Sequence, residues 1–208
     1  MQILIVGASG RVGHNLSRIL AQAGHQVVGT QSHLGPADLP VLDLMYATVD
    51  EIAQKIQQLG DFNAVYFVAG SRGKALLQVD LNGAVKLMTA LEQLGIKRYI
   101  QLSSYKADRQ AEWDGYRGDL TNYQIAKFYA DRWLQEKTAL DYTILQPGSL
   151  TEDDQVTGVE FMTNQAGKNT IATVAQVLAD LLQHDNTIHK TITMHQGDQS
   201  IAAALGQL

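Results

Sequence analysis

The chain has 208 residues, 45% hydrophobic and 18% charged, which is typical of a soluble globular protein and long enough for one generous domain. The net charge of −5 without a basic run argues against a nucleic-acid partner, and the absence of cysteine excludes disulfides and thiolate metal sites. No apolar run approaches the roughly 20 residues of a membrane span, and the N-terminus does not read as a signal peptide, so we expect a cytoplasmic protein without membrane contact.

Short apolar strands alternate with amphipathic helices along most of the chain. The expected strands are residues 2–6, 25–30, 40–44, 63–70, 97–104 and 140–148, and the expected helices are 11–24, 48–60, 76–96 and 120–138. Helices of this length between strands predict right-handed βαβ units. We therefore expect an α/β fold, with a doubly wound parallel sheet and helices on both of its faces.

After residue 149 the alternation is looser. Strands are expected at 157–162 and 189–195, and helices at 170–184 and 200–208. These elements are too few for an independent domain. We expect a single domain over residues 1–208, in which residues 150–208 form a short C-terminal extension that helps to build a substrate pocket.

A glycine-rich segment, GASGRVG, joins the first expected strand to the first expected helix. Glycines at such a position let the backbone approach a pyrophosphate, and the helix N-terminus supplies amide donors and the positive end of a dipole. The pattern predicts that a dinucleotide is bound by Gly7, Ser9, Gly10, Arg11, Val12 and Gly13. A glycine-rich turn without a ligand is the alternative interpretation.

The end of the second expected strand bears on the choice between NAD and NADP. An acidic residue there hydrogen-bonds the ribose 2′-hydroxyl and repels a 2′-phosphate. This chain has polar residues and no acid at that point: Thr30, Gln31, Ser32 and His33. With Arg11 nearby, the segment favours NADP, unless Arg11 is an ordinary solvated helix residue. Asp43, after the third expected strand, either accepts from the adenine amino group or caps a turn.

The segment YQIAK places Tyr123 and Lys127 four residues apart, and hence on one face of a helix. An ammonium beside a phenol lowers its pKa from the ordinary value of about 10, so the tyrosine would exchange a proton with substrate near neutral pH. The strand before this helix ends in Ser103 and Ser104, at the sheet edge where ligands of such folds bind. Ordinary packing on a helix surface is the alternative.

These motifs, in this order, resemble the short-chain dehydrogenase/reductase superfamily, and more narrowly its small atypical NAD(P)H-binding members related to flavin/biliverdin reductase and to NAD-dependent epimerases/dehydratases. The resemblance is carried by GASGRVG, VAGS, VDLNGAVKLMTALEQLGIKRYIQLSS, YQIAK and LDYTILQPGSL, which together span nearly the whole chain. It implies a Rossmann-like fold and a catalytic set of Ser104, Tyr123 and Lys127. It also implies cofactor contacts from Lys127, Ala69, Gly70, Ser71, Pro147 and Gly148.

Three positions depart from the pattern of that superfamily. Asp80 stands where standard members carry the asparagine of a proton relay, and Gln146 stands where many relatives have an arginine before Pro-Gly. The arginine that is common on the second strand is also missing. These departures affect the relay and the cofactor choice, and leave the expected fold unchanged.

The loop between Ser104 and Tyr123 carries the aromatic residues Tyr105, Trp113 and Tyr116. They would either stack on a planar substrate or anchor the loop to the body of the protein. The six histidines do not have the spacing of a metal site, so no metal is expected.

The first hypothesis on function is an NAD(P)H-dependent oxidoreductase that transfers hydride to or from a small carbonyl, quinone or flavin-like acceptor. We expect it to act as a monomer or small homo-oligomer. The alternatives are an epimerase/dehydratase-like enzyme with bound nicotinamide and a non-catalytic NADP-binding redox sensor. The short C-terminal extension argues against the former, and the intact Ser/Tyr/Lys set against the latter.

Overall fold

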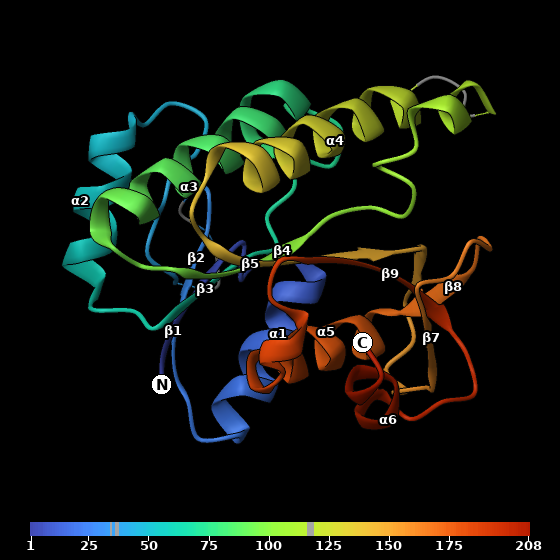
Figure 1. Ribbon diagram of the computed structural model, residues 1–208. Coiled ribbons are helices and arrows are strands. Elements are labelled where there is room, and N and C mark those ends of the chain that lie inside the picture. The colour runs from blue at the N-terminus through green and yellow to red at the C-terminus, as the bar shows by residue number, and fades with distance from the viewer. Residues whose placement is uncertain (34, 36–37, 116–118) are drawn as a thin grey trace.

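The computed structural model describes residues 1–33, 35, 38–115 and 119–208, and its centre is a seven-stranded sheet in the order β2-β1-β3-β4-β5-β9-β7 (Figure 1). The strands are β1 Gln2–Val6, β2 Gln26–Thr30, β3 Ala64–Phe67, β4 Arg98–Leu102, β5 Asp141–Pro147, β6 Ser149–Thr151, β7 Val159–Phe161, β8 Lys168–Thr170 and β9 Lys190–Gln196. Neighbouring strands of this sheet pair in parallel, except that β7 runs antiparallel to β9. The predicted mostly parallel α/β fold is confirmed.

Helices cover both faces of the sheet. They are α1 Arg11–Gln22, α2 Val49–Leu59, α3 Asn82–Leu94, α4 Asp119–Lys137, α5 Ile171–Asp180 and α6 Ile201–Gly206. Figure 1 shows α2, α3 and α4 on one face and α1, α5 and α6 on the other. Successive side chains of β1 serve the two faces in turn: Ile3 and Ile5 belong to the core beneath α1 and α5, and Leu4 and Val6 to the core beneath α2 and α3.

Two segments differ from the sequence prediction. Residues 40–44 form no strand; one bridge joins Val41 to Gln31, because Pro40 lacks an amide donor and Asp43 caps the next turn. The expected long helix 76–96 begins as a π-helical turn, Leu76–Leu81, before α3 starts. Such wide turns are frequent at functional sites, and this one carries the buried Asp80.

The C-terminal extension is part of the main sheet. Strand β9 pairs with β5, and β7 forms the edge beyond it. Strands β6 and β8, which the sequence pattern did not predict, form a separate two-stranded parallel sheet. Among the described residues, no helix combines the length and apolar character needed to cross a membrane.

Candidate functional site

The glycine loop leads from β1 into α1, and its three glycines have different environments. Gly7 has a φ of 98°, and a Cβ there would lie 2.6 Å from Ala69 Cα. A Cβ on Gly13 would lie 2.3 Å from the Gly7 carbonyl oxygen. Among the described residues, a Cβ on Gly10 would come within 4 Å of that same oxygen alone, at 3.2 Å. Packing within the protein thus accounts for Gly7 and Gly13, whereas Gly10 has an open side that fits the approach of a phosphate.

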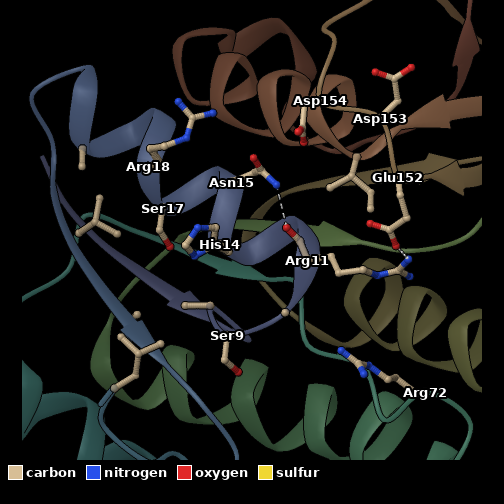
Figure 2. Close-up of a pocket in the computed structure, with 17 residues that line it drawn as sticks. Ser9, Arg11, His14, Asn15, Ser17, Arg18, Arg72, Glu152, Asp153 and Asp154 are labelled. Atoms are coloured by element: carbon tan, nitrogen blue, oxygen red, sulfur yellow. Dashed lines mark hydrogen bonds and ion pairs between the residues drawn. The ribbon is translucent and has the colours of Figure 1, made fainter. Parts of the chain in front are cut away.

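A pocket of about 1010 Å³ lies beside this loop (Figure 2). It is lined by Ser9, Gly10 and Arg11 of the predicted set, and Val12 and Gly13 are buried next to them in α1. Figure 2 shows Arg11 reaching across to Glu152, with which it forms an ion pair. Ser104, Tyr123 and Lys127 are all described by the structure, and none of them lines this pocket.

Several charged residues of this pocket were not predicted from the sequence. Arg72 follows β3, and three consecutive acids follow β6: Glu152, Asp153 and Asp154. The acidic run is visible in the sequence, but its position depends on the unpredicted strand β6. The pocket therefore combines cations from the glycine loop and Arg72 with acids from the C-terminal extension.

The residues predicted to meet the adenosine lie near the end of β2. The exposed Ser32 hydroxyl is 2.9 Å from His33 Nδ1. Asp43 Oδ1 accepts hydrogen bonds from the backbone amides of Met45 and Tyr46, at 2.9 and 3.1 Å. One oxygen of Asp43 therefore caps a turn, and its contact with adenine stays a prediction.

Helix α4 brings Tyr123 and Lys127 together. The Lys127 Nζ atom lies 5.6 Å from the centre of the Tyr123 ring and 5.8 Å from that of Phe67. It also donates a 3.3 Å hydrogen bond to the carbonyl oxygen of Leu102, at the end of β4. Lys127 is only 3% exposed, so its ammonium is held inside the protein against the ends of β3 and β4.

Asp80 is the anionic partner of this lysine. Its Oδ1 lies 3.9 Å from Lys127 Nζ, and its Oδ2 accepts a 3.0 Å hydrogen bond from the Ser71 amide. The ion pair offsets part of the cost of burying the ammonium. It also ties Lys127 to the segment after β3 that contains Ala69 and Gly70. Asp80 Oδ1 and Ser71 Oγ are buried without a hydrogen-bond partner among the described residues, an arrangement that fits the hydroxyl groups of a ribose.

Gln124, which was not predicted from the sequence, determines the hydrogen bonding of Ser104. Its Nε2 donates to Ser104 Oγ at 3.2 Å and to the Tyr105 carbonyl oxygen at 3.0 Å. Because a carbonyl oxygen can only accept, the amide nitrogen of Gln124 must face this way. Ser104 Oγ therefore accepts from Gln124 and keeps its own hydrogen to donate to another oxygen.

Asp131 was also missed, although it continues the face of Tyr123 and Lys127 by one further turn of α4. It is buried and accepts hydrogen bonds from Gln101, Ser103 and Gln146. Its spacing of four residues from Lys127 is the signal that would have found it.

The predicted nicotinamide-flanking residues lie at the end of β5. The Pro147 carbonyl oxygen accepts from the Tyr105 amide, and the Gly148 amide donates to the carbonyl oxygen of Met194 in β9, both at 3.0 Å.

The aromatic residues of the loop before α4 are enclosed by the protein. Trp113 is 8% exposed, donates to the Lys106 carbonyl oxygen and packs edge-on against Phe128 of α4. Tyr105 is equally enclosed, at 6% exposed. These two aromatics favour the anchoring interpretation, and Tyr116 lies outside the described residues.

The sheet order, the glycine loop and the strand-end position of Tyr123 and the buried Lys127 define a Rossmann-like α/β protein. Residues 7–185 match the model of the NAD(P)H-binding family, and the chain belongs to that family. It is 35% identical to the UPF0659 protein YMR090W of Saccharomyces cerevisiae, over 96% of this chain and 95% of that protein. It is 29% identical to a Bacillus subtilis protein named "Uncharacterized sugar epimerase YhfK", over the full length of both.

Among solved structures, the chain is similar to the oxidoreductase ylbE from Lactococcus lactis. The TM-score is 0.91 with 38% sequence identity, over 100% of this chain and 96% of that one. The resemblance to NAD(P)H-binding proteins inferred from the motifs is thereby confirmed. One of these relatives carries the name of an epimerase and one solved structure that of an oxidoreductase.

Proposed function

We propose that the protein is an NAD(P)H-dependent oxidoreductase of the short-chain dehydrogenase/reductase type, which moves hydride to or from a small carbonyl, quinone or flavin-like acceptor. The observation that carries this proposal is the ammonium of Lys127, buried 5.6 Å from the Tyr123 ring on α4. Burying a charge costs several kcal/mol before its partners compensate. Nucleotide binding alone gives a use for the cation but none for the phenol held beside it, whereas an enzyme that transfers protons uses both.

The dinucleotide would lie along the ends of the strands. The backbone amides of the glycine loop and the start of α1 would hold the pyrophosphate. Lys127, Asp80 and Ser71 would bind ribose hydroxyls, and Ala69, Gly70, Pro147 and Gly148 would border the nicotinamide. When bound, the nicotinamide supplies or accepts the hydride.

The protein's own part in the reaction is the movement of a proton. The Tyr123 phenol lies beside the buried ammonium of Lys127, and it would give its proton to a carbonyl oxygen and regain one from water. Ser104 would donate its free hydroxyl hydrogen to the same oxygen and orient the substrate. With an alcohol as substrate the steps run in reverse.

NADP is the cofactor that we expect to be preferred. The support is the absence of an acid among residues 30–33 at the end of β2, together with Arg11 at the start of α1 and the exposed hydroxyl of Ser32. We further propose that residues 150–208 complete the substrate pocket of a single domain. A cytoplasmic location and a monomeric or small homo-oligomeric state complete the proposal.

An epimerase is the second candidate, because a full-length relative carries that name. The same set of side chains would then remove a proton from a substrate hydroxyl and return it after a transient oxidation. Such a reaction changes the substrate without net consumption of NADPH.

The test starts with calorimetric titration of the purified protein with NADPH and NADH. Carbonyls, quinones and flavins are then screened for acceptor-dependent oxidation of the bound nucleotide, and sugar nucleotides for isomerisation. Oxidation by a member of the first group supports the oxidoreductase, and isomerisation without net oxidation supports the epimerase. Failure to bind either nucleotide would overturn both.

A further inference from the structure

A buried carboxylate lies beneath the candidate active site and has no part in the proton transfer proposed above. Asp131 is 2% exposed, and hydrogen bonds reach both of its oxygens. Oδ1 accepts from Gln101 Nε2 at 2.6 Å, and Oδ2 accepts from Ser103 Oγ at 2.6 Å and from Gln146 Nε2 at 3.1 Å. Three hydrogen bonds to one buried side chain make a specific structural connection.

The three donors come from two neighbouring strands, close to predicted site residues. Gln101 lies in β4, and Ser103 follows the last residue of that strand, directly before Ser104. Gln146 lies in β5, directly before the Pro147–Gly148 pair. Asp131 itself belongs to α4, four residues after Lys127. One carboxylate thus joins the three segments that carry the proposed catalytic and nicotinamide-flanking residues.

The charge of this carboxylate is sensitive to pH. Burial raises the pKa of Asp131 to about 6, although its three hydrogen bonds and the positive charge of Lys127 act in the opposite direction. The other titratable groups around it are Tyr99 of β4, whose hydroxyl donates to Gln101 Oε1 at 3.0 Å, and Asp80, which pairs with Lys127. Burial raises the pKa of Tyr99 well above its ordinary value, so this phenol stays neutral.

Protonation of Asp131 is incompatible with the observed hydrogen bonds. The ionised carboxylate accepts from all three donors. The protonated group carries an O–H that needs an acceptor, but each of the three groups facing it acts as a donor in the structure. At least one of these hydrogen bonds must then reverse or break.

We propose that Asp131 is a positioning residue, whose carboxylate holds the ends of β4 and β5 against the face of α4 that carries Tyr123 and Lys127. Uptake of a proton weakens this connection and misplaces Ser104 relative to Tyr123. The role rests on the function proposed above for that pair. The fall of kcat at low pH would then be caused by protonation of Asp131 and not by protonation of a group that touches the substrate.

The experiment uses Asp131→Asn, which keeps the size of the side chain and removes the titrating charge. Asp180→Asn is the matched control, because Asp180 lies on α5, across the sheet, and burial raises the pKa of its carboxyl as well. The first readout is the NMR shift of the Ser103, Ser104 and Gly148 backbone amides between about pH 5 and 8, without cofactor or substrate. The second is kcat and KM over the same range, with NADPH and the acceptor found in the screen.

In the wild type and in Asp180→Asn, the amide shifts should change with a common midpoint near the Asp131 pKa of about 6, and kcat should fall below it with little change in KM. In Asp131→Asn both transitions should disappear, with kcat reduced by up to ~10²-fold, the scale expected when reacting groups are misplaced. Should that variant not fold, Ser103→Ala serves instead. It removes one donor to the carboxylate and should move the midpoint to higher pH.

A midpoint that persists in Asp131→Asn, or one that Ser103→Ala leaves in place, overturns the proposal. So does a lower melting temperature of Asp131→Asn with an unchanged pH profile of kcat, because that result marks a merely structural role. Amide shifts that titrate in the wild type and not in Asp131→Asn support the proposal even where no acceptor is reduced. In that case the oxidoreductase assignment alone fails.

Discussion

The two ends of the candidate site are built in different ways. At the glycine loop the groups available to a ligand are backbone amides and exposed side chains such as Arg11. At the other end, Lys127 and Asp80 are buried, and each depends on the other. At the glycine loop, the absence of a side chain on Gly10 leaves space for a phosphate at the surface. At the other end, Lys127 and Asp80 form a buried ion pair in which each charge stabilises the other. Mutations at the first end should change nucleotide binding, and those at the second should change turnover and stability together.

The largest effect is expected from Gly10→Val. The valine side chain would occupy the space beside the first amides of α1 that a pyrophosphate needs, so calorimetry should detect no NADPH binding. The protein should still fold, because a Cβ at this position meets only Gly7 O, at 3.2 Å, among the described residues. Gly206→Val is the control, since a Cβ there has no described atom within 4 Å. Unchanged NADPH affinity in a folded Gly10→Val protein would contradict the glycine-loop site.

Lys127→Met should abolish most turnover and also weaken NADPH binding, because it removes both the cation beside Tyr123 and the proposed ribose contact. It leaves Asp80 buried without its cation, which typically costs about 3–5 kcal/mol of stability. The double variant Asp80→Asn/Lys127→Met removes both charges, so chemical denaturation should show most of that loss restored. Its turnover should stay low. Recovery of turnover in the double variant would mean that Lys127 has only a structural role.

The buried Asp131 should make stability fall with rising pH. Its pKa is about 6 in the folded protein against an ordinary value of 3.8, so the folded state binds the proton more tightly. The free energy of unfolding should therefore be largest below the lower value and decrease as the pH rises between the two, by roughly 3 kcal/mol at about 1.4 kcal/mol per pKa unit. Urea unfolding at several pH values measures this contribution as the free energy of unfolding of the wild type minus that of Asp131→Asn. A difference that grows with pH instead would show that folding favours the ionised form.

The smallest effect is expected from Glu152→Gln. The Arg11–Glu152 ion pair is exposed and contributes little to stability, but Glu152 would compete for the guanidinium with the 2′-phosphate of the proposed NADP. Its removal should strengthen NADPH binding severalfold and leave NADH binding unchanged. Glu136→Gln, which removes an exposed ion pair with Arg132 on α4, is the control. Equal gains for both nucleotides would show that Arg11 does not select the phosphate.

Local sequence patterns predicted those features of the fold and the site that depend on residues close together in the chain. The apolar strands, the glycine loop and the shared face of Tyr123 and Lys127 all follow from spacings of a few residues. The remaining features depend on distant contacts. The segment 40–44 forms only a bridge because Pro40 and Asp43 prevent a strand, and Glu152 reaches Arg11 only through the strand β6. The four-residue spacing from Lys127 places Asp131 on the same face of α4, but it does not reveal the hydrogen-bond donors that Asp131 meets on β4 and β5.

Tyr123→Phe tests the central claim most directly. Turnover is measured for the wild type, for Tyr123→Phe and for Tyr129→Phe, an exposed tyrosine of the same helix, with NADPH and both a simple carbonyl and a quinone. If Tyr123 supplies the proton, its variant should bind NADPH normally and lose ~10²–10⁴-fold of kcat on the carbonyl, the usual value of acid–base assistance. Activity on the quinone should largely remain, because solvent can protonate that product. Full carbonyl activity in Tyr123→Phe would contradict the assignment of Ser104, Tyr123 and Lys127 as the catalytic set.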